Sequence, residues 1–89
     1  MILGRVVGTV WATQKDEQLS GMKLQIVQKV DLNGSLQSGF LVAVDSVGAG
    51  IGETVLVVQG SSARQTALTK DRPVDSVITA IVDKVDIPT

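Results

Sequence analysis

Apolar and polar positions alternate at the start of the chain. In residues 2–13, ILGRVVGTVWAT, every even position is apolar or glycine, whereas Arg5 and Thr9 are among the odd positions. A period of two with many β-branched residues predicts a strand. Gly4 and Gly8 would weaken a flat strand, but they suit one that coils sharply, as barrel strands do.

The same enrichment in β-branched and aliphatic residues predicts four more strands, at residues 24–30, 40–47, 54–58 and 76–85. Leu24 and Ile26 lie on one side of the first of these strands. The polar segment 14–23 is expected to be a loop. Asn33-Gly34 is a strong hairpin signal, because both residues tolerate positive φ.

One short helix is expected between the fourth and fifth strands. Residues 61–68, SSARQTAL, allow one or two helical turns with Ser61 or Ser62 as the N-cap, and Pro73 breaks any continuation. Five short strands and this helix predict an all-β fold, a small five-stranded barrel within a single domain that spans residues 1–89. Closure would remove the sheet edges that so apolar a chain would otherwise expose.

Composition adds an expectation of assembly. The chain has 89 residues, of which 44% are hydrophobic, and it contains no Cys and no His. A chain of this size buries only about 60–65% of the surface of its unfolded form, so small domains often need disulfides, metals or oligomerisation. Without Cys the chain cannot form disulfides, and without Cys or His a transition-metal site is not expected. Some of the apolar surface is therefore expected to contact another subunit.

Charge and hydropathy limit the kinds of partner and the location that the sequence predicts. The formal net charge is −1, and the Lys and Arg residues are scattered, so no surface for a polyanion is predicted. The apolar runs are short and interrupted by charges, which excludes a membrane-spanning helix. The first residues, MILGRVVG, lack the pattern of a secretory signal, so a cytoplasmic location is expected.

A glycine-rich segment precedes the fourth strand. Residues 46–64 read SVGAGIGETVLVVQGSSAR, in which Gly48, Gly50 and Gly52 are followed by Glu53. This spacing fits neither G-x-G-x-x-G nor a P-loop, and a strand former follows where both motifs need a helix. The acidic residue would also repel a phosphate. The glycines therefore indicate a tightly turned loop, and small residues would let several copies of it approach around an axis.

The segment GSSAR, residues 60–64, is open to two interpretations. It could bind an anion at a helix start with Arg64 as the charged partner. The favoured interpretation is a helix cap beside a surface or interface arginine.

No catalytic pattern is found among the serines and carboxylates. Without His, a nucleophilic serine would need Lys or a carboxylate as its base, and the sequence places none beside one. The carboxylates fit as strand ends or turn caps. The residues weighed are Ser20, Ser61, Ser62, Asp45, Glu53, Asp75 and Asp83. No catalytic residue and no cofactor are therefore assigned.

A small five-stranded barrel also permits binding of single-stranded nucleic acid, and this is the alternative function. Such proteins stack bases on aromatic rings above a positively charged groove. Trp11 and Phe40 are the only aromatic residues, and the net charge is slightly negative. The side chains argue against this alternative, and Trp11 is better explained as a packing or interface residue.

Four segments together carry a resemblance to a known family. They are MILGRVVGTVWATQK, KLQIVQ, VAVDSVGAGIGETVLVVQGSSAR and PVDSVITAIVDKV. In this order and at these spacings the chain resembles the EutN/CcmL family, the pentameric vertex proteins of bacterial microcompartment shells. The similarity covers nearly the whole chain, and the central VD-x-VGAG and GSSAR motifs are its most specific parts.

The resemblance implies an oligonucleotide/oligosaccharide-binding (OB)-type barrel that forms a tapered homopentamer at the vertices of a shell tiled by hexameric proteins. It implies no enzymatic activity, no cofactor, and neither nucleic acid nor membrane as a partner. It implies that one loop surrounds the five-fold axis, namely Gly48, Ala49, Gly50, Ile51 and Gly52. It further implies candidate subunit contacts at Trp11, Glu53, Ser61, Ser62 and Arg64.

Overall fold

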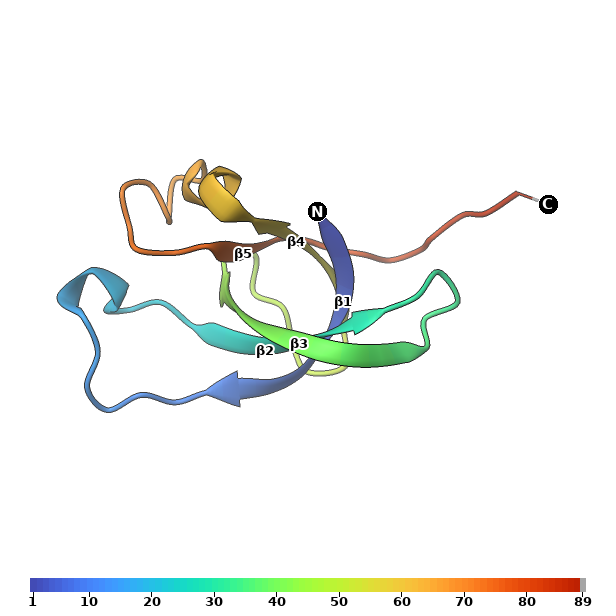
Figure 1. Ribbon diagram of the computed structural model, residues 1–89, viewed down its shortest axis with the longest axis horizontal. Coiled ribbons are helices and arrows are strands. Elements are labelled where there is room, and N and C mark those ends of the chain that lie inside the picture. Colours follow the sequence, from blue (N-terminus) through green and yellow to red (C-terminus); the bar gives the residue numbers. More distant parts are fainter. Residues whose placement is uncertain (89) are drawn as a thin grey trace.

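Five strands close into a barrel in the computed structural model, which describes residues 1–88 (Figure 1). They are β1 (Ile2–Val10), β2 (Leu24–Val30), β3 (Leu36–Asp45), β4 (Thr54–Gln59) and β5 (Ser76–Ile81). Their order around the barrel is β1-β2-β3-β5-β4, and β4 pairs with β1 to complete the ring. Four of these pairings are antiparallel, whereas β3 and β5 make a short parallel one. The predicted all-β, five-stranded, OB-like barrel is confirmed.

The strand ends differ from the predicted ones because each strand extends as far as a partner strand pairs with it. β1 ends at Val10, because Val10 opposite Leu24 is its last pair with β2. β3 begins at Leu36, earlier than predicted, because it pairs there with the end of β2. β5 ends at Ile81, its last pair with β4, although the apolar pattern continues beyond it. Residues stay in a strand only while a neighbour supplies hydrogen bonds.

The predicted short helix between the fourth and fifth strands is present, but it is shorter than residues 61–68, and its serine cap is wrong. The structure forms a short 3-10 turn, η2 (Gly60–Arg64), preceded by Gln59 without a side-chain cap bond. After this turn a side chain bonds to the backbone in place of a helical N–H: the Thr69 hydroxyl donates to the Ala63 carbonyl. A second such turn, η1 (Glu17–Leu19), lies within the predicted loop 14–23.

The predicted hairpin between β2 and β3 is present, with a turn type that the sequence did not specify. Gly34 has φ of 84°, and Asn33 is not in the left-handed region. The Gly34 N–H donates to the Asp31 carbonyl at 3.0 Å, and the Asp31 carboxylate accepts from the Asn33 N–H at 2.9 Å. This is a turn closed by one left-handed glycine, as in three-residue hairpin loops.

Gly4 is required for space between β1 and β2. A Cβ atom at this position would overlap the Val27 side chain and lie 3.0 Å from the Gln28 carbonyl oxygen. The two strands therefore approach too closely for any side chain at this point. The prediction that glycine suits a strongly coiled barrel strand agrees with this geometry.

The apolar core has two parts on the two faces of the closed sheet. The first fills the barrel and comprises Val6, Val27, Ala43, Ala49, Val55, Val57 and Ile78. The second lies on the outer face, where η2 and the segment before β5 cover the sheet, and comprises Met22, Val44, Ala63, Val74 and Val77. Within residues 1–88, no helix is long and apolar enough to cross a membrane.

Candidate assembly site

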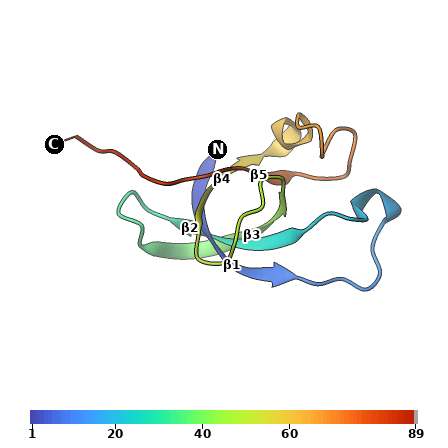
Figure 2. The ribbon, with the colours of Figure 1, turned by 180° about the vertical axis from the view of Figure 1, so that it is seen from behind.

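The glycine-rich loop, residues 46–53, joins β3 to β4 and runs across the barrel in the view from behind (Figure 2). Gly48 and Gly52 have φ of 75° and 91°, which is the left-handed region that favours glycine. Gly50 is constrained differently, since a Cβ atom there would lie 3.2 Å from the Glu53 Oε1 atom. That oxygen accepts the Gly50 N–H at 2.6 Å. The loop therefore turns tightly for reasons of backbone shape.

The predicted loop residues occupy different environments. Ala49 is buried and belongs to the barrel core, so it anchors the loop to its own subunit. Ile51 lies at the tip with 69% of its surface exposed. Glu53 is exposed, but its carboxylate is engaged by the Gly50 N–H. Ile51 is therefore the most exposed large apolar side chain of the loop, ahead of Val47 at 39%.

Two buried polar side chains hold this loop, and the sequence reasoning missed the one on β2. Gln25 and Asp45 are both buried, and the Gln25 Nε2 atom donates to the Ala49 carbonyl at 2.9 Å. The Asp45 Oδ1 atom accepts the N–H groups of Val47 and Gly48 at 3.0 and 2.9 Å. The signal in the sequence was that this residue, Gln25, lies two positions before Val27 and therefore on the same strand face.

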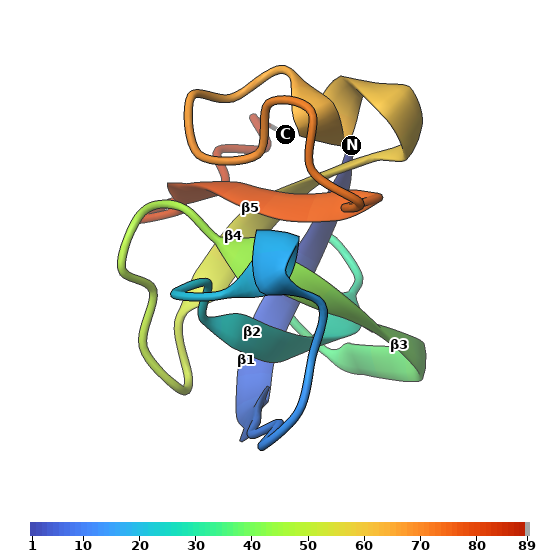
Figure 3. The same cartoon turned by 90° about the vertical axis from the view of Figure 1, so that its left-hand side faces the viewer.

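The GSSAR turn lies at the other end of β4 from the glycine-rich loop (Figure 3). The six residues of β4 span about 20 Å at the usual rise per strand residue. Ser61 and Ser62 are exposed, whereas Ala63 is buried beneath them. The Arg64 guanidinium donates to the Val74 carbonyl at 3.3 Å. The structure thus does not bring the two predicted contact regions together.

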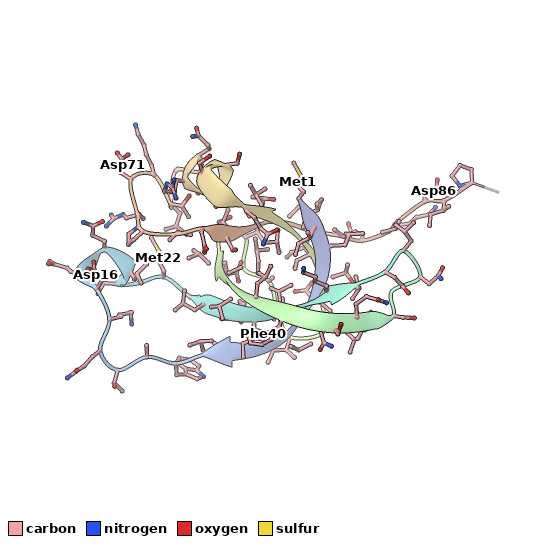
Figure 4. The ribbon with its side chains drawn as sticks, viewed as in Figure 1. Met1, Asp16, Met22, Phe40, Asp71 and Asp86 are labelled. Carbon is pink, nitrogen blue, oxygen red and sulfur yellow. The ribbon has the colours of Figure 1, made fainter. Side chains whose placement is uncertain are left out.

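Apolar side chains also face outward on β2 and β3, where they are half-buried on β2 and exposed on β3. We call Ile26, Phe40 and Val42 the outer apolar face, because Ile26 pairs with Val42 and Phe40 lies two residues before Val42 on β3. Figure 4 labels Phe40 on this strand. Phe40 is 67% exposed. Val42 also lines a groove of about 250 Å³ beside the second core cluster. Trp11, which follows β1, is 88% exposed. Of these residues, only Trp11 was predicted as a contact.

The polar groups of the described chain form no reactive cluster. Among residues 1–88, no group of three potential metal ligands was found. Every buried side-chain nitrogen and oxygen in that range has a hydrogen-bond partner. The buried polar groups are thus occupied within the subunit.

Comparison with known proteins identifies close relatives. The EutN_CcmL family, described as ethanolamine utilisation protein EutN/carboxysome, matches residues 1–83. The carboxysome shell vertex protein CcmL of Nostoc sp. is 47% identical over 88 residues, covering 98% of this chain and 87% of CcmL. The solved structure of Gloeobacter violaceus CcmL has a TM-score of 0.93 at 44% identity, covering 98% of this chain and 90% of that one. The GrpN pentameric microcompartment shell protein of Rhodospirillum rubrum has a TM-score of 0.90 at 43% identity, covering 99% and 100%.

These matches extend along nearly the whole chain, so they include the barrel, the glycine-rich loop and the GSSAR turn. They confirm the resemblance found in the sequence, the structural role in place of an enzymatic one, and the location in a microcompartment shell. The chain therefore belongs to the EutN/CcmL family of pentameric shell vertex proteins of bacterial microcompartments.

Proposed function

We propose that residues 1–89 act as one vertex domain, five copies of which close a microcompartment shell by contacting its hexameric proteins. A flat layer of hexagonal tiles cannot close, and five-fold units supply the curvature that it lacks. The protein then acts through geometry. Its sequence has to encode one interface between identical subunits and another with the tiles.

The observation that carries this proposal is the outer apolar face. The barrel interior is already filled by its own core, yet Phe40, Val42 and Trp11 remain exposed on the surface. Patches of this kind mark interaction sites in soluble proteins. A ring that closes by rotation joins two different surfaces of each subunit, so the contact is heterologous. Each contact is expected to bury about 1,200–2,000 Å², with the outer apolar face on one side of it.

We place the tip of the glycine-rich loop near the five-fold axis. Ile51 is an exposed apolar side chain between Gly50 and Gly52, and backbones with small side chains pack closely. Trp11, Ser61, Ser62 and Arg64 are proposed to lie in contacts between subunits, away from the axis. In a head-to-tail ring, equivalent residues of different subunits approach one another only near that axis.

Single cysteines test this placement, because the chain has no cysteine of its own. Ile51→Cys is expected to give disulfide-linked dimers on mild oxidation of the assembled ring, since a disulfide needs Cα atoms within about 7 Å. Some chains must stay unlinked, because a ring of five cannot pair completely. Denaturing electrophoresis without reductant measures the linked fraction.

Ser62→Cys is the matched control at the opposite end of β4. Ser62 is also exposed, on η2, but the Ser62→Cys chain should remain monomeric on the gel. Linking of the Ser62→Cys chains with none of the Ile51→Cys chains would put the GSSAR turn at the axis and refute the proposed orientation. The comparison is made on rings whose mass is first verified by native mass spectrometry.

A further inference from the structure

We infer that Gln25 is a positioning residue that gives the glycine-rich loop one fixed shape within each subunit. Gln25 lies on β2 between its pairing partners Thr9 on β1 and Ala43 on β3, and its exposed fraction is 0%. Its side chain points to the barrel interior, on the same strand face as Val27. A buried amide has to find partners for both its N–H groups and its carbonyl.

The Gln25 amide finds these partners in two separate parts of the chain. Its Nε2 atom donates to the Ala49 carbonyl at 2.9 Å and to the Asp45 Oδ2 atom at 3.5 Å. Its Oε1 atom accepts the Thr9 hydroxyl at 2.8 Å. The two donors and the acceptor are therefore all engaged. The Ala49 carbonyl and the Asp45 carboxylate can only accept, so they hold the NH₂ end of the amide toward the loop, and the Thr9 hydroxyl donates to the remaining oxygen. Gln25 thereby links β1 to the middle of the loop.

Asp45 extends this support along the loop backbone. While Oδ2 faces Gln25, Oδ1 accepts the N–H groups of Val47 and Gly48 at 3.0 and 2.9 Å. An aliphatic side chain at position 25 could fill the same space but could donate to neither Ala49 nor Asp45. The requirement for an amide at this site is thus imposed by the loop and not by the packing of the barrel.

The rest of the loop is also tied to its own subunit. The Gly50 N–H donates to Glu53, and the Gly52 N–H donates to the Val6 carbonyl at 2.8 Å. A loop whose polar groups are satisfied in this way needs no neighbouring subunit to take its shape. If the loops surround the five-fold axis, which is the proposed function on which this step rests, they form an opening of constant width and not a gate.

Amide hydrogen exchange of the full-length protein tests the role of Gln25. In Gln25→Leu, the Val47 and Gly48 amides are expected to exchange about tenfold faster relative to the β4 amides than in the wild type, because loss of the amide frees the loop without opening the sheet. Val27→Ala is the matched control on the same buried strand face. It should speed exchange in the loop and in β4 by similar factors.

Thr9→Val provides a second variant in case Gln25→Leu fails to fold. It leaves Gln25 in place but removes the hydroxyl that donates to the amide oxygen, so a smaller acceleration confined to the loop is expected. Equal acceleration of loop and β4 amides in both variants, or none in the loop, would overturn the inference. Native mass is measured on the same samples. Faster exchange in the loop than in β4 supports the role of Gln25, whatever the number of subunits in the ring. The number of subunits in the wild-type ring tests the proposed assembly separately.

Discussion

The two ends of β4 are built in different ways. At its start, the glycine-rich loop is held by buried polar side chains and by left-handed glycines at positions 48 and 52. At its end, the GSSAR turn rests on the buried Ala63, while Ser61 and Ser62 face outward. The loop has its polar groups satisfied within the subunit, whereas the turn leaves its hydroxyl groups accessible at the surface.

From this difference we propose that the two motifs serve assembly in separate ways. A loop fixed by its own subunit can set a geometry, because its shape does not depend on what it meets. A turn with exposed serine and arginine side chains can instead form polar contacts with a neighbour. Variants at the two ends should therefore separate the stability of the subunit from its association, with the larger losses of stability at the loop.

The largest effect is expected at Asp45. Asp45→Ala removes the acceptor of the Val47 and Gly48 N–H groups and one partner of Gln25, and should lower the free energy of unfolding by about 2–3 kcal/mol. Urea unfolding at a fixed subunit concentration measures this change. A loss no larger than that of the turn variants would remove the contrast between the two ends of β4.

Gly52 should show the next largest effect. Gly52→Ala introduces a side chain where φ is 91° and no atom lies within 4 Å of the new Cβ, so backbone strain alone should cost about 1–2 kcal/mol. Gly50→Ala is the control in the same loop, since Gly50 does not have positive φ and its new Cβ would meet only the end of the flexible Glu53 side chain. Its loss, measured by the same unfolding experiment, should be smaller. Equal losses would mean that backbone conformation does not govern the loop.

Arg64 should contribute less to stability than either loop residue. Arg64→Ala removes one hydrogen bond to the Val74 carbonyl, which is worth about 0.5–1 kcal/mol. If Arg64 also contacts a neighbouring subunit, the ring should dissociate at a higher protein concentration than that of the wild type. Analytical ultracentrifugation over a dilution series detects this shift. Unchanged dissociation would assign Arg64 to the turn alone.

The smallest change in stability is expected for the paired substitution of Ser61→Ala with Ser62→Ala. Both side chains are exposed, and surface substitutions usually change stability by less than about 0.5 kcal/mol. Any weakening of the ring in the same dilution series would then arise from contacts between subunits. A loss of unfolding free energy comparable with that of Gly52→Ala would show that the serines support the turn itself.

Alternation along the chain predicted the strands well, because a half-buried strand carries its pattern in neighbouring residues. It could not say which face of β2 is internal. Leu24 and Ile26 share one face, yet Gln25 and Val27 are the residues inside the barrel. The inward face of β2 includes a polar residue because a distant loop requires it. Contacts between residues far apart in the sequence leave no local signal.

The short helix after β4 was predicted in the right place, but its length and cap were not, for a related reason. The segment after Gly60 has the composition of a short helix. However, the Thr69 hydroxyl donates to the Ala63 carbonyl, and the Thr69 N–H donates to the Thr66 hydroxyl, so side chains make bonds that a longer helix would make through its backbone. The glycine-rich loop was predicted in outline, since glycine spacing is visible in the sequence. Its support by Gln25, and the outer apolar face around Phe40, depend on how the strands pair.

Native mass spectrometry of the purified wild-type chain is the most direct test of whether its surfaces encode five-fold closure. The exposed apolar side chains and the shared family architecture predict a single dominant species of five subunits that persists on dilution. A protein that stays monomeric at high concentration, or that forms rings with another number of subunits, would contradict this conclusion.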